Sequence, residues 1–259
     1  MRIGKRLRDF MRAIRPEPPY ERARTFESGS TDPRAILEDI RNRYDHESDL
    51  LHHFVDNRGP VVHKWHHYIP LYDRYLSRFR GGKTRFLEIG VGRGGSLRMW
   101  RRYFGDDAVI FGIDVEPDRA SFGGSHAQVR IGSQDDRGFL ESVVGEMGGL
   151  DVVIDDGSHQ MAHVRSTLET LFPLLDERGV YVIEDLHAAY WSRFGGGLRS
   201  PTSFFRLVDE LVDDMHHWYH PEAPRHPGIG DTCFGIHVHD SLVVLEKNLR
   251  HRPINSRIG

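Results

Sequence analysis

Carboxylates and a histidine follow two apolar runs in the second half of the chain. Residues 155–159 read Asp-Asp-Gly-Ser-His, and residues 184–185 read Glu-Asp. Carboxylate oxygens are hard ligands that suit Mg²⁺ or Mn²⁺, and a histidine beside them can act as a general base. The only cysteine, Cys233, is far away in sequence, so thiolate chemistry with zinc or iron–sulfur clusters is not favoured. These residue types predict a hard divalent metal site with a base next to it.

A strand, a helix and a second strand must position these acids. Residues 150–154 and 180–183 are short, apolar and rich in β-branched side chains, as buried strands are. Apolar residues recur at helical spacing over residues 162–175 between them. A strand–helix–strand unit makes its strands parallel neighbours, and open α/β sheets bind ligands at the carboxyl ends of their strands. The acids after the two strands are therefore expected to converge at that edge.

A glycine-rich turn opens the predicted sheet. Residues 85–89 form an apolar strand, residues 90–95 read Gly-Val-Gly-Arg-Gly-Gly, and a helix follows. Such a turn lets the backbone approach a ligand closely, at a helix N-terminus that favours anionic groups. Gly90, Gly92 and Gly95 also satisfy the dinucleotide pattern G-x-G-x-x-G, so an NAD-dependent oxidoreductase is an alternative.

Two acids flank this turn. The next predicted strand, residues 109–113, ends at Asp114, where a carboxylate can hold two ribose hydroxyls of either kind of cofactor. Glu88 lies two residues before the first glycine. Glu88 favours a cofactor other than NAD, because an acid followed by glycines is the first sequence motif of a different family.

Through Glu88, Gly90 and Gly92 the chain resembles the class I S-adenosylmethionine (SAM) methyltransferases over residues 84–246. The 155–159 and 184–185 motifs, with Lys-Trp-His-His-Tyr at residues 64–68, resemble the metal-dependent sugar O-methyltransferases. These include the mycinamicin-type antibiotic enzymes and mycobacterial enzymes that methylate mannosides. The mycinamicin-type enzymes have an extra N-terminal domain, which this shorter chain is expected to lack.

The resemblance implies one α/β domain with a Rossmann-like fold. Its sheet is expected to have seven mostly parallel strands and to close with an antiparallel hairpin, which we place at residues 235–246. Residues 81–259 are assigned to this methyltransferase domain. Residues 1–80 are assigned to an N-terminal helical segment and linker, expected to act as a lid over the cofactor and acceptor.

The resemblance also implies a role for each motif residue, with SAM as the methyl donor and Mg²⁺ or Mn²⁺ as the metal. The implied metal ligands are Asp156, Glu184 and Asp185, and the implied general base is His159. The implied cofactor residues are Glu88, Gly90, Gly92 and Ser96 around the methionine portion, Asp114 at the ribose, Ser133, Gln134 and Asp135 beside the adenine, Asp155 near the sulfonium, and Lys64 and Tyr68 in the segment that closes over the cofactor.

Aromatic residues follow the second pair of acids. His187, Tyr190 and Trp191 precede a glycine run at residues 195–197. Aromatic faces pack against the C–H faces of sugars, and mobile glycines suit a lid, so these three residues are candidates for the acceptor pocket. Core packing or a subunit contact explains them equally well.

Composition excludes several classes of function. The chain has 259 residues, of which 38% are hydrophobic, and no apolar run approaches the roughly 20 residues of a membrane span. A net charge of −3 gives no general attraction to nucleic acid. One cysteine allows no internal disulfide, which fits a reducing cytoplasm. We expect a cytoplasmic protein, with a homo-oligomer possible, that binds a small-molecule or oligosaccharide acceptor.

The N-terminal segment divides into a basic amphipathic stretch, a linker and two helices. Residues 1–14 carry apolar residues at helical spacing beneath a basic face, and residues 15–30 are rich in proline, glycine and serine. A membrane surface or a partner could bind the basic face, although packing on the domain or fraying is the simpler expectation. Helices are predicted from Pro33 and over residues 68–79.

The predicted function is therefore SAM- and Mg²⁺-dependent methylation of a sugar hydroxyl. The favoured acceptor is a mannoside or rhamnoside of an actinobacterial glycan. Methylation of a deoxysugar on a macrolide or other antibiotic is the first alternative, and a catechol-type phenol is the second. An NAD-dependent oxidoreductase and a non-catalytic SAM-binding module are the alternatives from other classes.

Overall fold

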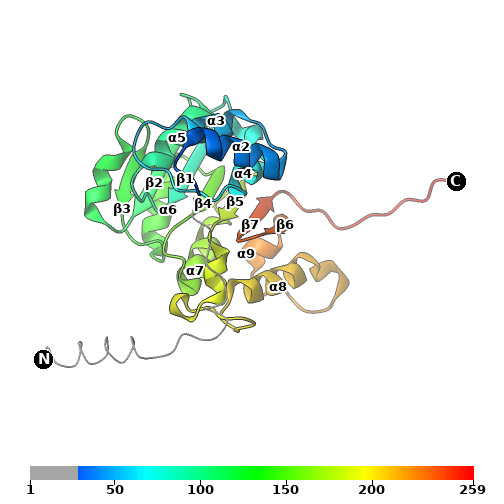
Figure 1. Cartoon of the computed structure of the whole chain (residues 1–259). Coiled ribbons are helices and arrows are strands. Elements are labelled where there is room, and N and C mark those ends of the chain that lie inside the picture. The colour runs from blue at the N-terminus through cyan, green and yellow to red at the C-terminus, as the bar shows by residue number, and fades with distance from the viewer. Residues whose placement is uncertain (1–28) are drawn as a thin grey trace, which may run out of the picture.

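The computed structural model describes residues 29–259. The basic stretch predicted over residues 1–14, and all but the last two residues of the predicted linker, lie outside the described residues. From residue 81 to the end of β7 at Lys247, strands and helices alternate (Figure 1).

Seven strands form one sheet in the order β3-β2-β1-β4-β5-β7-β6. The first five strands in this order are parallel, whereas β7 runs antiparallel to both β5 and β6. The predicted seven-stranded, mostly parallel sheet with a closing hairpin is confirmed. The strands are β1 (Arg85–Ile89), β2 (Val109–Asp114), β3 (Gln128–Ile131), β4 (Val152–Asp155), β5 (Val180–Ile183), β6 (Cys233–His239) and β7 (Leu242–Lys247).

Helices cover both faces of the sheet (Figure 1). Short 3₁₀ turns lie between them, notably η1 (Ser77–Phe79), η2 (Pro117–Gly123), η3 (Leu186–Tyr190), η4 (Ser192–Phe194) and η5 (His217–Tyr219). The α-helices are α2 (Pro33–Tyr44), α3 (Asp49–Val55), α4 (Tyr68–Leu76), α5 (Gly95–Phe104), α6 (Arg137–Met147), α7 (Met161–Leu171), α8 (Phe204–Met215) and α9 (Pro227–Gly230).

Two apolar cores lie on opposite faces of the sheet, because successive side chains of a strand point to opposite sides. In β1, Phe86 belongs to one core and Leu87 to the other. One core joins the sheet to α6, α7, α8 and α9, and the other joins it to α2, α3, α4 and α5. The parallel strands are thus buried on both faces, as their apolar sequences require.

The described part of the N-terminal segment belongs to the second core. Ile40 of α2, Leu50 of α3 and Tyr72 of α4 are buried in it, together with Trp100 of α5. The helix predicted from Pro33 and the helix predicted over residues 68–79 are both present, the second as α4 followed by η1. These helices complete the covering of one face of the sheet, and their role as a lid stays a prediction.

The strand register aligns the ends of the central strands. Asp155 at the end of β4 pairs with Ile89 of β1 and with Ile183 of β5. The residues that come next along the three strands are Gly90, Asp156 and Glu184, so they leave the sheet at the same level. The glycine turn and the acids that follow β4 and β5 therefore lie at the same edge of the sheet.

The structure ends in a segment without helix or strand. The residues after β7 extend away from the body of the protein (Figure 1), and Ile254 and Ile258 are almost fully exposed. Among residues 29–259, no helix is both long enough and apolar enough to cross a membrane.

Candidate metal and cofactor site

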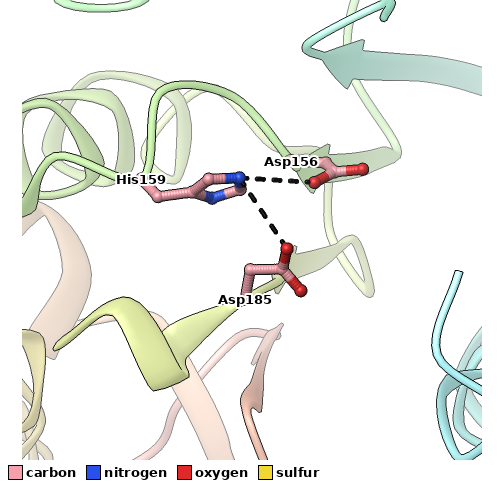
Figure 2. A group of neighbouring side chains, drawn as sticks. All are labelled: Asp156, His159 and Asp185. Atoms are coloured by element: carbon pink, nitrogen blue, oxygen red, sulfur yellow. Dashed lines mark ion pairs between the residues drawn. The ribbon is translucent and has the colours of Figure 1, made fainter. Parts of the chain in front are cut away.

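Asp156, His159 and Asp185 form a group at the carboxyl edge of the sheet. One ligand atom of each lies within 4.8 Å of those of the other two. The Nε2 atom of His159 is 3.8 Å from Asp156 Oδ1 and 3.8 Å from Asp185 Oδ2, and the three side chains point toward one another (Figure 2). About a quarter of each side chain remains exposed, so a ligand can reach the group from solvent.

Two members of this group have an uncommon backbone. The φ angle is +54° at His159 and +56° at Asp185, in the left-handed region that residues with a Cβ atom rarely adopt. Such conformations cost about 1–3 kcal/mol and persist where the surrounding structure enforces them, frequently at functional sites. Here the left-handed residues turn both side chains back toward the edge of the sheet.

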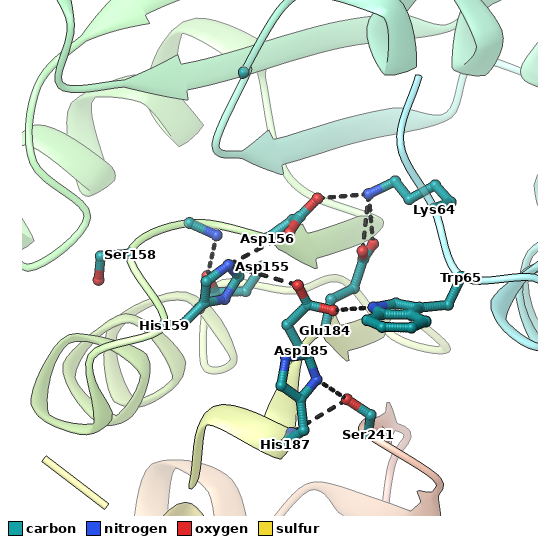
Figure 3. A network of polar contacts seen from close by, with 12 residues as sticks. Lys64, Trp65, Asp155, Asp156, Ser158, His159, Glu184, Asp185, His187 and Ser241 are labelled. Atoms are coloured by element: carbon teal, nitrogen blue, oxygen red, sulfur yellow. Dashed lines mark hydrogen bonds and ion pairs between the residues drawn. The ribbon is translucent and has the colours of Figure 1, made fainter. Parts of the chain in front are cut away.

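Residues of the segment before α4 hold the outer oxygens of the two aspartates (Figure 3). Lys64 Nζ donates to Asp156 Oδ2 at 2.7 Å. Trp65 Nε1 and the Tyr68 hydroxyl donate to Asp185 Oδ1 at 2.9 and 3.0 Å. Each aspartate thus has one oxygen fixed from behind and the other directed at His159. Partners of this kind orient metal ligands and tune their affinity.

Glu184 lies apart from this group. Both of its carboxylate oxygens accept from Lys64 Nζ, at 3.0 and 2.8 Å, and its side chain is buried. Burial raises the pKa of Glu184 well above its usual value, a shift that Asp156 increases and Lys64 opposes. Burial alone would lower the pKa of Lys64, but the carboxylates around it raise it well above its usual value. The metal-ligand role of Glu184 stays a prediction.

The donor set fits a hard or borderline divalent ion. Two carboxylate oxygens and an imidazole nitrogen converge, which suits Mg²⁺ or Mn²⁺ better than a thiophilic metal. Within the described residues, this is the one group of three or more such side chains close enough to hold an ion. His159 is placed either to complete the ligand set or to take a proton beside it.

The glycine turn touches the metal site directly. Gly90 has a φ of +88°, and a Cβ atom there would lie 2.1 Å from the carbonyl oxygen of Asp156. A Cβ atom on Gly95 would lie 2.3 Å from the carbonyl oxygen of Val61. Only glycine fits these two close approaches. The cofactor turn, the first metal-site acid and the segment before α4 are therefore packed together.

Glu88 is buried beneath the turn. Its carboxylate accepts from Ser96 Oγ at 2.7 Å and from Trp100 Nε1 at 3.2 Å. Burial raises the pKa of Glu88 to about 7, against the opposing effect of the nearby Lys64 ammonium. Ser96 and Glu88 thus lie directly beneath the turn. Their contact with a methionine moiety stays a prediction.

Asp114 ties the end of β2 to the turn. One carboxylate oxygen accepts from the backbone N–H groups of Val91 and Gly92, at 3.0 and 3.3 Å. The other accepts from the N–H of Glu116 at 3.0 Å. The carboxylate therefore lies against the turn, at the position where the sequence predicts a ribose contact.

The three residues predicted beside the adenine differ in burial and in hydrogen-bond partners. Gln134 is buried and donates to Asp155 Oδ1 at 3.1 Å, and its own oxygen accepts from Ser158 N at 2.7 Å. Ser133 and Asp135 bond to each other nearer the surface. Burial raises the pKa of Asp155 to about 7. Gln134 thus fixes Asp155 and the loop after β4, and direct contact of these residues with a cofactor stays a prediction.

The three acceptor candidates lie in two different places in the structure. His187 and Trp191 pack edge to face with ring centroids 4.9 Å apart, and His187 also packs against Trp65 on the metal side. Burial lowers the pKa of His187. Tyr190 instead packs on Phe205 and lines a separate hollow of about 450 Å³. His187 and Trp191 are the candidates beside the acids.

Two residues of the site were not predicted from the sequence. Trp65 bonds Asp185, and its place within the Lys-Trp-His-His-Tyr motif was the available signal. The hydroxyl of Ser241, in the turn between β6 and β7, lies 3.0 Å from the Tyr68 hydroxyl oxygen and bonds His187 Nδ1 at 2.7 Å. No local pattern marks Ser241, because the fold alone brings the hairpin turn to this edge.

Comparison with known proteins agrees with this geometry. Residues 87–186 match a family model described as a methyltransferase domain. These residues form a methyltransferase domain. The chain is also 33% identical to MycE, a methyltransferase of the mycinamycin biosynthetic pathway solved in complex with Mg, SAH and mycinamycin VI. The TM-score is 0.67, and the alignment covers 82% of this chain and 53% of that one.

Curated relatives of this chain come from Streptomyces and Micromonospora. A tetracenomycin rhamnosyl 3'-O-methyltransferase of Streptomyces olivaceus is 41% identical over 71% of this chain and 50% of its own length. Mycinamicin VI 2''-O-methyltransferase of Micromonospora griseorubida is 39% identical over 82% of this chain and 55% of its own length. The chain spans about half the length of the curated relatives it matches.

Proposed function

We propose that the protein transfers a methyl group from SAM to a hydroxyl of a deoxysugar in a glycosylated small molecule, with a divalent ion, Mg²⁺ or Mn²⁺, as cofactor. The observation that carries this proposal is the meeting of Asp156, His159 and Asp185 directly against the glycine turn. A methyl donor and a metal-dependent acceptor site would then be neighbours, as a transfer between them requires.

Each part of the chemistry has a residue of this chain to perform it. A sugar hydroxyl is a weak acid, and a divalent ion bound by Asp156 and Asp185 would supply the Lewis acidity that lowers its pKa. His159 Nε2 accepts the hydroxyl proton as the sugar oxygen bonds to the methyl carbon and the carbon–sulfur bond breaks, leaving S-adenosylhomocysteine. His159 Nε2 lies 3.8 Å from one oxygen of each aspartate, so the base and the proposed metal ligands face the same space.

The relatives support an antibiotic-type deoxysugar over the mannoside expected from the sequence. The tetracenomycin enzyme is named for a rhamnosyl group, and MycE was solved with the glycoside mycinamycin VI. A relative from Streptomyces antibioticus is named an L-olivosyl-oleandolide 3-O-methyltransferase. We therefore propose a 6-deoxyhexose on a polyketide-type aglycone as the acceptor class, with His187 and Trp191 against the sugar.

The other functions receive less support. An NAD-dependent oxidoreductase would leave the Asp156–His159–Asp185 group without a role, and residues 87–186 match a methyltransferase domain. A non-catalytic SAM-binding module would not need a base held by two carboxylates. A catechol could use the same edge, because adjacent hydroxyls chelate a metal in the same way, so catechols belong in the substrate test.

The test is methyl transfer measured by mass spectrometry. The protein is incubated with SAM, Mg²⁺ and a panel of rhamnosides, olivosides, mannosides and catechols, with and without EDTA. We expect one deoxysugar glycoside to gain a methyl group and EDTA to abolish the gain. Methylation that persists in EDTA, or that is confined to catechols or mannosides, would contradict the proposal.

A further inference from the structure

Lys64 places a buried ammonium group between the cofactor turn and the metal site. Its Nζ atom lies 2.7 Å from Asp156 Oδ2, 2.8 Å from the nearer oxygen of Glu184 and 3.9 Å from Glu88 Oε1. The Lys64 side chain is 2% exposed. One cation therefore neutralises part of the charge of three carboxylates. Two of them, Asp156 and Glu184, are predicted metal ligands, and Figure 3 shows the Lys64 contacts to both.

We infer that Lys64 and the divalent ion compete for the same carboxylates, so that the ammonium is an internal stand-in cation that weakens metal binding. This inference rests on the proposed function, because it requires the metal site at this edge. It goes beyond that function by giving Lys64 control over the metal affinity of the site.

The carboxylates for which the ammonium and the ion would compete are Asp156 and Glu184. Asp156 is shared, with Oδ2 on the ammonium and Oδ1 facing His159. Glu184 is not shared, because both of its oxygens accept from Lys64. An ion that recruited Glu184 would have to displace the ammonium or share the carboxylate with it. The ion must also approach Asp156 while a second cation lies beside it, and like charges repel strongly where water is excluded.

The backbone that carries Lys64 is held independently of its ammonium. Trp65 and Tyr68 bond Asp185, and the carbonyl groups of Pro60 and Val61 lie against Gly95. Removal of the charge is therefore expected to leave the segment in place. The matched control is Lys83, an exposed lysine that lies outside the metal site.

The test is calorimetric titration of Mn²⁺ into metal-stripped protein. We expect Lys64→Met to bind Mn²⁺ about tenfold or more tightly than wild type, and Lys83→Met to match wild type. Adding Glu184→Gln to Lys64→Met should remove the gain, because the freed carboxylate is its source. Equal or weaker binding by folded Lys64→Met would overturn the inference. No Mn²⁺ binding by either wild type or Lys64→Met would instead overturn the proposed metal site.

If Lys64→Met does not fold, lysine labelling of the wild-type chain tests the inference instead. Lysines are acetylated with and without saturating Mg²⁺, and the labelled fraction of each is read by peptide mass spectrometry. We expect Mg²⁺ to raise the labelling of Lys64 several-fold while Lys83 and Lys247 serve as references. Unchanged or reduced labelling of Lys64 would overturn the inference.

Discussion

The two ends of the parallel sheet handle charge in opposite ways. At the amino end, Arg85 donates to both oxygens of Asp151, at 2.6 and 2.8 Å, and also pairs with Asp176. At the carboxyl end Glu88, Asp155 and Glu184 are buried, and the buried ammonium of Lys64 lies beside Glu88 and Glu184. At the first end two carboxylates share one guanidinium, whereas at the second end three carboxylates, Glu88, Asp156 and Glu184, share one ammonium.

This difference indicates that the charged cluster at the amino end is structural, whereas the cluster at the carboxyl end is suited to bind a ligand. In a bidentate arginine–aspartate pair each charged group already has an oppositely charged partner, so the pair needs no ligand. Buried carboxylates without enough cations are costly, and their raised pKa values reflect that cost. A divalent ion and a sulfonium are both cations, so the ligands proposed for the carboxyl end would supply the missing charge.

The largest expected effect comes from Asp156, which joins the metal group to Lys64. Asp156→Ala should abolish metal-dependent methyl transfer, because both the ion and His159 lose a partner. Binding of S-adenosylhomocysteine should survive, measured by calorimetry alongside a turnover assay. Normal turnover by this variant would remove Asp156 from the mechanism.

His159 is expected to show the next largest effect. His159→Ala should lower the rate of methyl transfer by about 10² to 10⁴, the usual contribution of a general base. Single-turnover kinetics at saturating Mg²⁺ measures this step, and Mn²⁺ titration shows whether the ion still binds. Loss of Mn²⁺ binding would make His159 a ligand, and an unchanged rate would refute both roles.

At the amino end the same kind of substitution should affect stability alone. Asp151→Asn removes one charge from the pair with Arg85 and should lower the free energy of unfolding by about 1.5–3 kcal/mol. Urea denaturation measures the loss. Mn²⁺ affinity should equal that of wild type, and a change in it would mean that the two ends are not independent.

The smallest effect concerns Cys233, which begins β6 and pairs with Lys247 at the amino end of the sheet. Burial raises the pKa of the Cys233 thiol to about 12, so at pH 8 the thiol stays protonated and the reactive thiolate is scarce. A chromogenic disulfide reagent should react slowly with the native protein and quickly in guanidinium. Fast reaction of the native thiol would show that the amino end of the sheet is accessible to the reagent.

Much of the fold could be predicted from the sequence because its signals are local. Residues 150–154 and 180–183 are apolar runs that end at acids, and the structure has β4 and β5 there. Helix α8 was not predicted, although its apolar residues Leu207 and Leu211 follow helical spacing. Parallel topology then fixed which strand ends meet.

Less of the site could be predicted, because its contacts are set by tertiary structure. Spacing alone does not reveal that Lys64, 120 residues before Glu184, takes both oxygens of that carboxylate. Nor does it reveal that Gln134 turns inward to Asp155, or that the hairpin turn at Ser241 reaches His187. The residue types were visible in sequence, whereas their pairing required the fold.

The most direct test of the central claim is calorimetric titration of S-adenosylhomocysteine and a rhamnosyl or olivosyl glycoside into EDTA-treated protein, with and without Mg²⁺. The account predicts that S-adenosylhomocysteine binds and that the glycoside binds measurably only when Mg²⁺ is present. No binding of S-adenosylhomocysteine, or glycoside binding of equal affinity without Mg²⁺, would contradict it.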